Sequence, residues 1–215
     1  MTRHVTLVRH AESELNIRQP SIIGGRSRWC ELTPRGIAQA RHLGRWLRDT
    51  GPPIDRVVSS TAVRAQQTAR YSLEQTDIPL RRLETFTELE EMCQGDWENR
   101  DRSATHTPEF FAQLARDPWH FRAPGGESSA DVFARGLHWL DTVARAGPGP
   151  HTWVFTHGMV IKLLVAGISR SDRRTAWQLP IQNTSLTRLH HTASGWVVVQ
   201  VNTFPQGVID DAMYR

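Results

Sequence analysis

Short apolar runs alternate along the chain with segments in which apolar residues recur at helical spacing. The runs stop at polar residues, which is typical of buried strands. The predicted strands end at residues 8, 60 and 156, and the predicted helices cover residues 34–47, 62–73, 128–146 and 158–167. Because strands and helices alternate, the chain is predicted to form a mostly parallel sheet with helices on both faces.

The carboxyl-terminal part has a different pattern. Two strand-like runs, residues 186–189 and 196–201, lie on either side of Gly195 and predict a closing strand pair. The start of the first long helix is marked by Thr33, a capping residue, and Pro34 at the first helical position. The prediction is therefore one domain over residues 1–215, with three α/β/α layers around a mostly parallel central sheet.

Residues from about 92 to 126 do not fit this alternation. They contain Gly95, Pro108, Pro118 and Pro124, together with several aromatic residues. We therefore expect a small cap-like insertion, a kind of segment that often shapes a substrate pocket.

Composition removes several classes of function. The formal net charge is +4, and the arginines are spread along the chain rather than clustered, so nucleic-acid binding is not expected. Cys30 and Cys93 have neither a disulfide framework nor metal-ligand spacing. No apolar run is long enough for a signal peptide or a membrane span. The expectation is a cytoplasmic protein whose oligomeric state is left open, with a homodimer as one option.

Polar residues follow three of the predicted strands at the point where each strand ends. The first strand leads into Arg9 and His10, the second is followed by Arg64, and the late strand leads into His157 and Gly158. Since ligands of parallel sheets bind beyond the carboxyl ends of the strands, these groups should share one edge. Two arginines, two histidines and the amino termini of helices there favour a compact dianion such as phosphate.

Motifs carried by these residues resemble those of the histidine phosphatase superfamily, the phosphoglycerate mutase-like proteins of branch 1. The motifs occur in the order typical of the family and cover nearly the whole chain. They read LVRHAESELN at residues 7–16, LTPRGIAQA at 32–40, SSTAVRAQQTA at 59–69, GDWE at 95–98, PGGES at 124–128 and THG at 156–158. The resemblance implies the phosphoglycerate mutase-like fold.

The resemblance also implies roles for individual residues. His10 would be the nucleophile that becomes transiently phosphorylated, which suits a neutral imidazole near pH 7. Arg9, Arg64 and His157 would bind the phosphoryl oxygens and offset their charge in the transition state. Asn16 and the backbone amide of Gly158 would add further donors to the phosphate pocket.

A leaving alkoxide needs a proton, and one carboxyl group can supply it and later activate water. In the family this glutamate stands four residues before the glycine of the Gly-x-Trp-Glu segment. Counting back from Gly95 gives Glu91, with Glu88 as the alternative. No ligand cluster indicates a metal, and the resemblance implies chemistry without metal or cofactor.

The family contains both hydrolases and mutases. The segment between Glu91 and Pro124 is short and aromatic, whereas the phosphoglycerate mutases that the chain resembles tend to carry a longer basic insertion. This favours a phosphatase acting on a small organic phosphomonoester, with phosphoglycerate mutase-type transfer as the alternative. A non-catalytic phospholigand-binding protein is a third hypothesis, although such a protein would not need the nucleophile.

Overall fold

A six-stranded sheet forms the centre of the computed structural model, which describes residues 2–18, 21–50 and 53–204. The strand order is β3 (Leu83–Phe86), β2 (Arg56–Ser60), β4 (His151–Thr156), β1 (Arg3–Arg9), β5 (Leu186–Thr192) and β6 (Gly195–Thr203). Strands β3, β2, β4 and β1 are parallel, whereas β5 is antiparallel to β1 and β6 is antiparallel to β5. The predicted mostly parallel sheet with a closing strand pair is confirmed.

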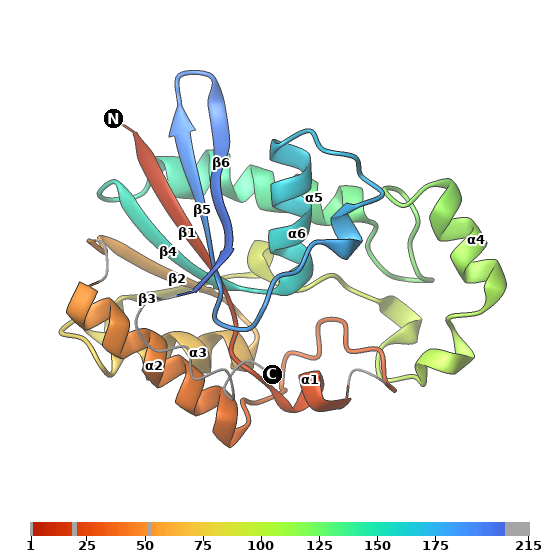
Figure 1. The fold of residues 1–215 in the computed structure, drawn as a ribbon, viewed down its shortest axis with the longest axis horizontal. Coiled ribbons are helices and arrows are strands. Elements are labelled where there is room, and N and C mark those ends of the chain that lie inside the picture. The colour runs from red at the N-terminus through yellow and green to blue at the C-terminus, as the bar shows by residue number, and fades with distance from the viewer. Residues whose placement is uncertain (1, 19–20, 51–52, 205–215) are drawn as a thin grey trace.

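Helices cover both faces of this sheet. Figure 1 shows α2 (Pro34–Thr50) and α3 (Val63–Leu73) on one side, and α5 (Ser129–Trp139) and α6 (Gly158–Ile168) on the other. The three α/β/α layers are thus as predicted. Within the described residues, no helix has the length and apolar character needed to cross a membrane.

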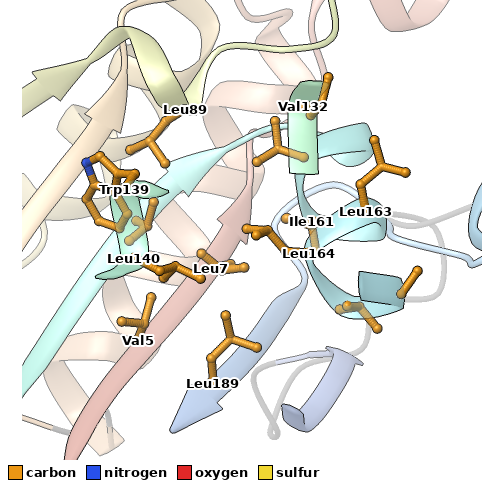
Figure 2. Packing of buried hydrophobic residues seen from close by; sticks show 14 of the residues in the cluster. Val5, Leu7, Leu89, Val132, Trp139, Leu140, Ile161, Leu163, Leu164 and Leu189 are labelled. Carbon is orange, nitrogen blue, oxygen red and sulfur yellow. The ribbon is translucent and has the colours of Figure 1, made fainter. Parts of the chain in front are cut away.

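Two hydrophobic clusters fill the spaces between the layers, because successive side chains of a strand point to opposite faces. Leu7 lies in the cluster under α5 and α6, with Ile161 and Leu164 (Figure 2). The next residue, Val8, lies in the cluster under α2 and α3, with Leu43. The strand β1 is therefore buried on both sides, which gives its end a rigid support.

Side chains fix the starts of two long helices. The hydroxyl of Thr33 accepts a hydrogen bond from the Gly36 amide at 3.0 Å, so the predicted cap of α2 is present. At α5, Ser128 and Asp131 form a reciprocal capping box. The helical run then continues beyond Trp139 as a π-helical turn, which helical periodicity did not predict.

The part of the chain expected to be an insertion forms short elements around α4 (Pro108–Arg116). Figure 1 shows α4 at the far side of the molecule from α2 and α3. Strand β3 and several short turns were not predicted. The remaining helices are α1 (Glu14–Arg18), η1 (Leu80–Arg82), η2 (Thr87–Leu89), η3 (Gly95–Trp97), η4 (Arg102–Ala104), η5 (Leu140–Ala144) and η6 (Ala176–Gln178).

Candidate active site

The carboxyl ends of the parallel strands bring the predicted residues to one edge of the sheet. Arg9 is the last residue of β1 and pairs in register with Thr156 of β4. The amide of His10 donates to the Thr156 carbonyl at 2.9 Å. This pairing holds the imidazole rings of His10 and His157 with their centroids 5.2 Å apart. Two strand ends that are far apart in the sequence thus form one site.

The hydrogen bonds of His10 define its tautomer. Its Nδ1 lies 2.8 Å from the Ala11 carbonyl oxygen, which can only accept, so Nδ1 carries the proton. The Nε2 atom then holds a lone pair in the neutral ring, and it accepts a hydrogen bond from Arg64 Nε at 3.3 Å. The unprotonated nitrogen, which could act as a nucleophile, is therefore the one that faces the guanidinium group.

The same environment keeps the His10 ring neutral. Burial lowers the pKa of His10 well below 6.5, and the positive charges of Arg64 and Arg9 lower it further. The hydrogen bond to the Ala11 carbonyl opposes this shift in part. A neutral imidazole whose Nε2 is unprotonated is the form that can attack an electrophile.

Both arginines are held in place by backbone carbonyls. Arg64 is 1% exposed, and its Nη1 donates to the carbonyls of Arg26 and Ser27 at 3.0 and 2.8 Å. Arg9 Nη1 donates to the Ile181 carbonyl at 2.5 Å. The Arg9 Nε atom is buried and has no hydrogen-bond partner among the described residues. The site therefore contains fixed cationic donors, one of which has a donor atom to offer an anion.

His157 is fully buried, and its ring lies next to that of His10. Its Nε2 lies 2.8 Å from Ser60 Oγ, at the end of β2. Its Nδ1 is buried and has no partner among the described residues. Burial, Arg64 and His10 together lower the pKa of His157 well below 6.5, so this ring is also neutral near pH 7.

Of the two candidate carboxyl groups, Glu91 lines the cavity that contains Arg9 and His10. Its Oε1 accepts from the Met92 amide at 2.9 Å, and its Oε2 accepts from the Met159 amide at 3.3 Å. Glu88 lies in η2 and is not among the residues that line this cavity. The geometry therefore favours Glu91 over Glu88.

Asn16 also lines the cavity, and its side chain is oriented by its neighbours. Its Oδ1 accepts from the Ser13 amide at 3.0 Å and from Asn183 Nδ2 at 3.3 Å. Asn183 Nδ2 is also 2.7 Å from the His10 carbonyl oxygen. The side chain of Asn183 thus links Asn16 to the backbone of His10.

Gly158 begins α6, and a Cβ built on it would lie 3.5 Å from Arg9 Nε.

The cavity has a volume of about 170 Å³ and continues from His10 into the segment that contains α4. Of the aromatic residues in that segment, Trp97, Phe110 and Phe121 line it, whereas Trp119 belongs to the core and Phe111 is 54% exposed. The part of the cavity beyond Arg9, His10 and Arg64 is therefore partly aromatic. Among the described residues, no cluster of histidine, cysteine, aspartate or glutamate side chains is arranged to hold a metal ion.

Comparison with known proteins places this geometry in context. The sequence model of the histidine phosphatase superfamily (branch 1) matches residues 5–203. A 2,3-bisphosphoglycerate-dependent phosphoglycerate mutase of Methylobacterium radiotolerans is 33% identical over 187 residues, covering 84% of each chain. The adenosylcobalamin/alpha-ribazole phosphatase of Salmonella typhimurium is 32% identical over 179 residues, covering 82% of this chain and 84% of its own length. A mycobacterial glucosyl-3-phosphoglycerate phosphatase has the same fold, with a TM-score of 0.77, 24% identity, and coverage of 95% of this chain and 100% of its own.

Proposed function

Because the chain belongs to the histidine phosphatase superfamily (branch 1), we propose that it hydrolyses a small organic phosphomonoester through a phosphohistidine on His10. The observation that carries the proposal is the environment of His10. Its Nε2 lone pair faces Arg64, and Arg9 and Glu91 line the same cavity. These groups supply a nucleophile, two cations for phosphoryl oxygens, and a carboxyl group.

In the first step, His10 Nε2 attacks the phosphorus atom, and the bond from phosphorus to the ester oxygen breaks. The leaving oxygen takes a proton from the carboxyl group of Glu91. Arg9 and Arg64 offset the charge on the phosphoryl oxygens as phosphorus moves between the two atoms. The phosphorylated ring is cationic, and its Nδ1 proton is held by the Ala11 carbonyl.

In the second step, the Glu91 carboxylate removes a proton from water, and the water oxygen attacks the phosphohistidine. The P–N bond breaks, inorganic phosphate forms, and His10 returns to its neutral state. Glu91 is protonated again and ready for the next substrate. His157 and Asn16 serve in both steps as fixed neighbours of the phosphoryl group.

Mutase-type transfer is the alternative, because a mutase and a phosphatase are similar to the chain at almost equal identity. A mutase returns the phosphoryl group to an organic acceptor and excludes water from the phosphohistidine. The aromatic side chains in the acceptor part of the cavity favour the phosphatase. A non-catalytic binding role is disfavoured, since the neutral, oriented His10 has no function in a protein that only binds phosphate.

The proposal is tested by hydrolysis of p-nitrophenyl phosphate. His10→Ala should reduce kcat/KM at least about a thousandfold, because the covalent intermediate is lost. His138→Ala is the matched control, since His138 is exposed on α5. Rapid alkaline quenching should trap an acid-labile phosphoryl group in the wild type. Equal rates for wild type and His10→Ala would contradict the mechanism.

Phosphoglycerate distinguishes the two reactions. The proposed phosphatase should release inorganic phosphate with or without a bisphosphorylated primer. Rapid interconversion of the phosphoglycerate isomers, dependent on the primer and with negligible phosphate release, would favour the mutase instead.

A further inference from the structure

Four rings from the segment around α4 line the side of the cavity away from the sheet. We call Trp97, His106, Phe110 and Phe121 the aromatic wall. They come from η3, from the residues before α4, from α4 itself and from the turn that follows it. The wall shares its cavity with His10 and Glu91.

Phe110 is the centre of this wall. Its ring centroid lies 4.4 Å from that of His106, 5.4 Å from Phe121 and 5.6 Å from Trp97. Phe110 meets Trp97 and Phe121 at 73° and 74°, the edge-to-face arrangement that aromatic pairs prefer. Because each ring is held by Phe110, the wall is a preformed surface rather than a set of independent side chains.

His106 contributes a neutral ring to the wall. Its Nε2 lies 3.0 Å from Arg102 Nη1, which can only donate, and its Nδ1 lies 3.0 Å from Thr105 Oγ1. Burial and the charge of Arg102 lower the pKa of His106. Both ring nitrogens are thus engaged within the same segment, and the ring presents a flat face that requires no polar partner.

Two charged side chains that line the cavity are paired with residues outside its lining, while Arg102 and Gln94 add further polar groups to it. Arg122 lies 3.2 Å from Asp131, and Glu127 lies 2.8 Å from Arg135. The cavity, at about 170 Å³, is also smaller than the pockets of roughly 300–1,000 Å³ that take drug-sized ligands. A phosphoryl group at the His10 end would take up part of this volume, so the space against the rings suits a small group.

Resting on the phosphatase function proposed above, we propose that the aromatic wall selects phosphomonoesters whose leaving group is a small planar apolar alcohol of about one ring. Planar aromatic groups can stack on or meet the edges of these rings, whereas a puckered ring of equal size makes a looser contact and lacks the aromatic pairing. A polyol would lose hydrogen bonds to water wherever it lies against the phenyl rings of Phe110 and Phe121, which cannot replace them. The wall would then decide which ester reaches Glu91 and His10.

Benzyl phosphate and cyclohexylmethyl phosphate test the planarity directly. Both release a primary alcohol with the same carbon count, so the ease of P–O cleavage is similar and the shape of the ring differs. The kcat/KM for benzyl phosphate should be about twofold to tenfold higher, and glycerol 3-phosphate should be poorer than both. A ratio of one, or a higher kcat/KM for 3-phosphoglycerate than for benzyl phosphate, would overturn the proposal.

Neighbouring phenylalanines supply a matched pair of variants. Phe110→Leu keeps apolar volume but removes the central ring, and it should abolish the preference for benzyl over cyclohexylmethyl phosphate. Phe111→Leu is the control. The ring centroid of Phe111 lies 4.9 Å from that of Phe110, but Phe111 is exposed and does not line the cavity. It should keep the preference. Equal ratios in the two variants would contradict a selective role for Phe110.

Non-hydrolysable phosphonates test the selectivity of the aromatic wall separately from the phosphohistidine mechanism. Calorimetric titration with benzylphosphonate and cyclohexylmethylphosphonate measures binding whether or not His10 turns over. Tighter binding of the planar compound that is lost in Phe110→Leu would support the wall even if His10→Ala remained active. Equal binding of both compounds by an enzyme that does form phosphohistidine would overturn the wall alone.

Discussion

The surroundings of His10, rather than a neighbouring base, keep the proposed nucleophile neutral. Burial, Arg64 and Arg9 lower its pKa well below 6.5, so the ring stays neutral as the pH falls below that value. A nucleophile is active above its own pKa, and the acid limb of the kcat/KM profile should therefore lie well below pH 6.5. Imidazole NMR should show His10 with an unprotonated Nε2 at pH 6.

Removing Arg64 tests the electrostatic part of this effect. Arg64→Met removes a guanidinium group that lowers the pKa of His10 more than Arg9 does. The pKa should therefore rise toward the ordinary value of 6.5. The NMR titration measures this independently of the phosphate binding that the variant also weakens. An unchanged titration midpoint would mean that the charge of Arg64 does not lower the pKa of His10.

Some residues of the site could be predicted from the sequence and others could not. Arg9, His10 and His157 adjoin apolar strands, so the pattern placed them at one sheet edge. Asn183 and Ser60 were not assigned roles, because their importance lies in contacts with His10 and His157 across the fold. The available signal for Asn183 was its place just before β5, whose start meets the end of β1 because the two strands are antiparallel.

Helix α5 supports the segment that carries Glu91. Arg135 donates to the carbonyls of Glu88 and Glu91 at 2.6 and 3.2 Å, and its guanidinium pairs with Glu127. Glu127 in turn accepts from the Cys93 amide at 2.9 Å. The ion pair thus holds the backbone on both sides of Glu91, and Arg135 is a positioning residue for the proposed proton donor.

Arg135→Met should therefore impair proton donation selectively. Turnover of benzyl phosphate, whose leaving alkoxide needs a proton, should fall about tenfold or more. Turnover of p-nitrophenyl phosphate should fall less, because nitrophenolate leaves without one. Glu91→Gln should show the same dependence on the leaving group, and Arg145→Met, an exposed change in the following turn, should show none. Equal losses for both substrates in Arg135→Met would indicate general damage instead.

Two helical glycines differ in what an added methyl group would meet. A Cβ on Gly44 of α2 would lie 2.1 Å from the Ser72 carbonyl oxygen of α3, whereas one on Gly136 would lie 3.1 Å from the flexible end of Leu164. Gly44→Ala should destabilise the protein by about 1–3 kcal/mol through overpacking. Gly136→Ala should be near neutral, since helix propensity offsets the contact. Urea unfolding measures both, and equal effects would contradict this interpretation.

The long elements were predictable because each buries an apolar stripe or run. Strand β3 was missed because it lies at the sheet edge and its sequence, Leu-Glu-Thr-Phe, does not alternate. The π-helical turn at Leu140–Ala144 was missed because one added residue per turn barely changes the hydrophobic spacing. Prolines and short turns in residues 92–126 indicated an irregular segment but could not specify how its rings pack on Phe110.

Burial of histidines affects the stability of the entire protein. His10 and His157 are buried at the junction of β1, β4 and α6, and their pKa values lie well below 6.5. Below pH 6.5 the unfolded chain binds protons at these imidazoles and the folded protein does not. The free energy of unfolding should therefore fall as the pH decreases from 6.5. Carboxylates such as Glu127, whose pKa is lowered from 4.5, affect stability only in a more acidic range.

Each proton withheld by the folded protein changes the free energy of unfolding by about 1.4 kcal/mol per pH unit. His10 and His157 together should therefore contribute up to about 2.7 kcal/mol per pH unit to the slope below pH 6.5, in addition to the contributions of His4, His42 and His106, whose pKa values are also lowered. His10→Gln should reduce the slope by up to about 1.4 kcal/mol per pH unit, because glutamine does not titrate. Urea unfolding at several pH values separates the loss of this titration from the loss of packing, because lost packing would lower the free energy of unfolding equally at every pH. If His10→Gln left the slope of unfolding free energy against pH unchanged, His10 would take up its proton in the folded protein as readily as in the unfolded chain. That result would contradict the proposal that a neutral His10 is the nucleophile.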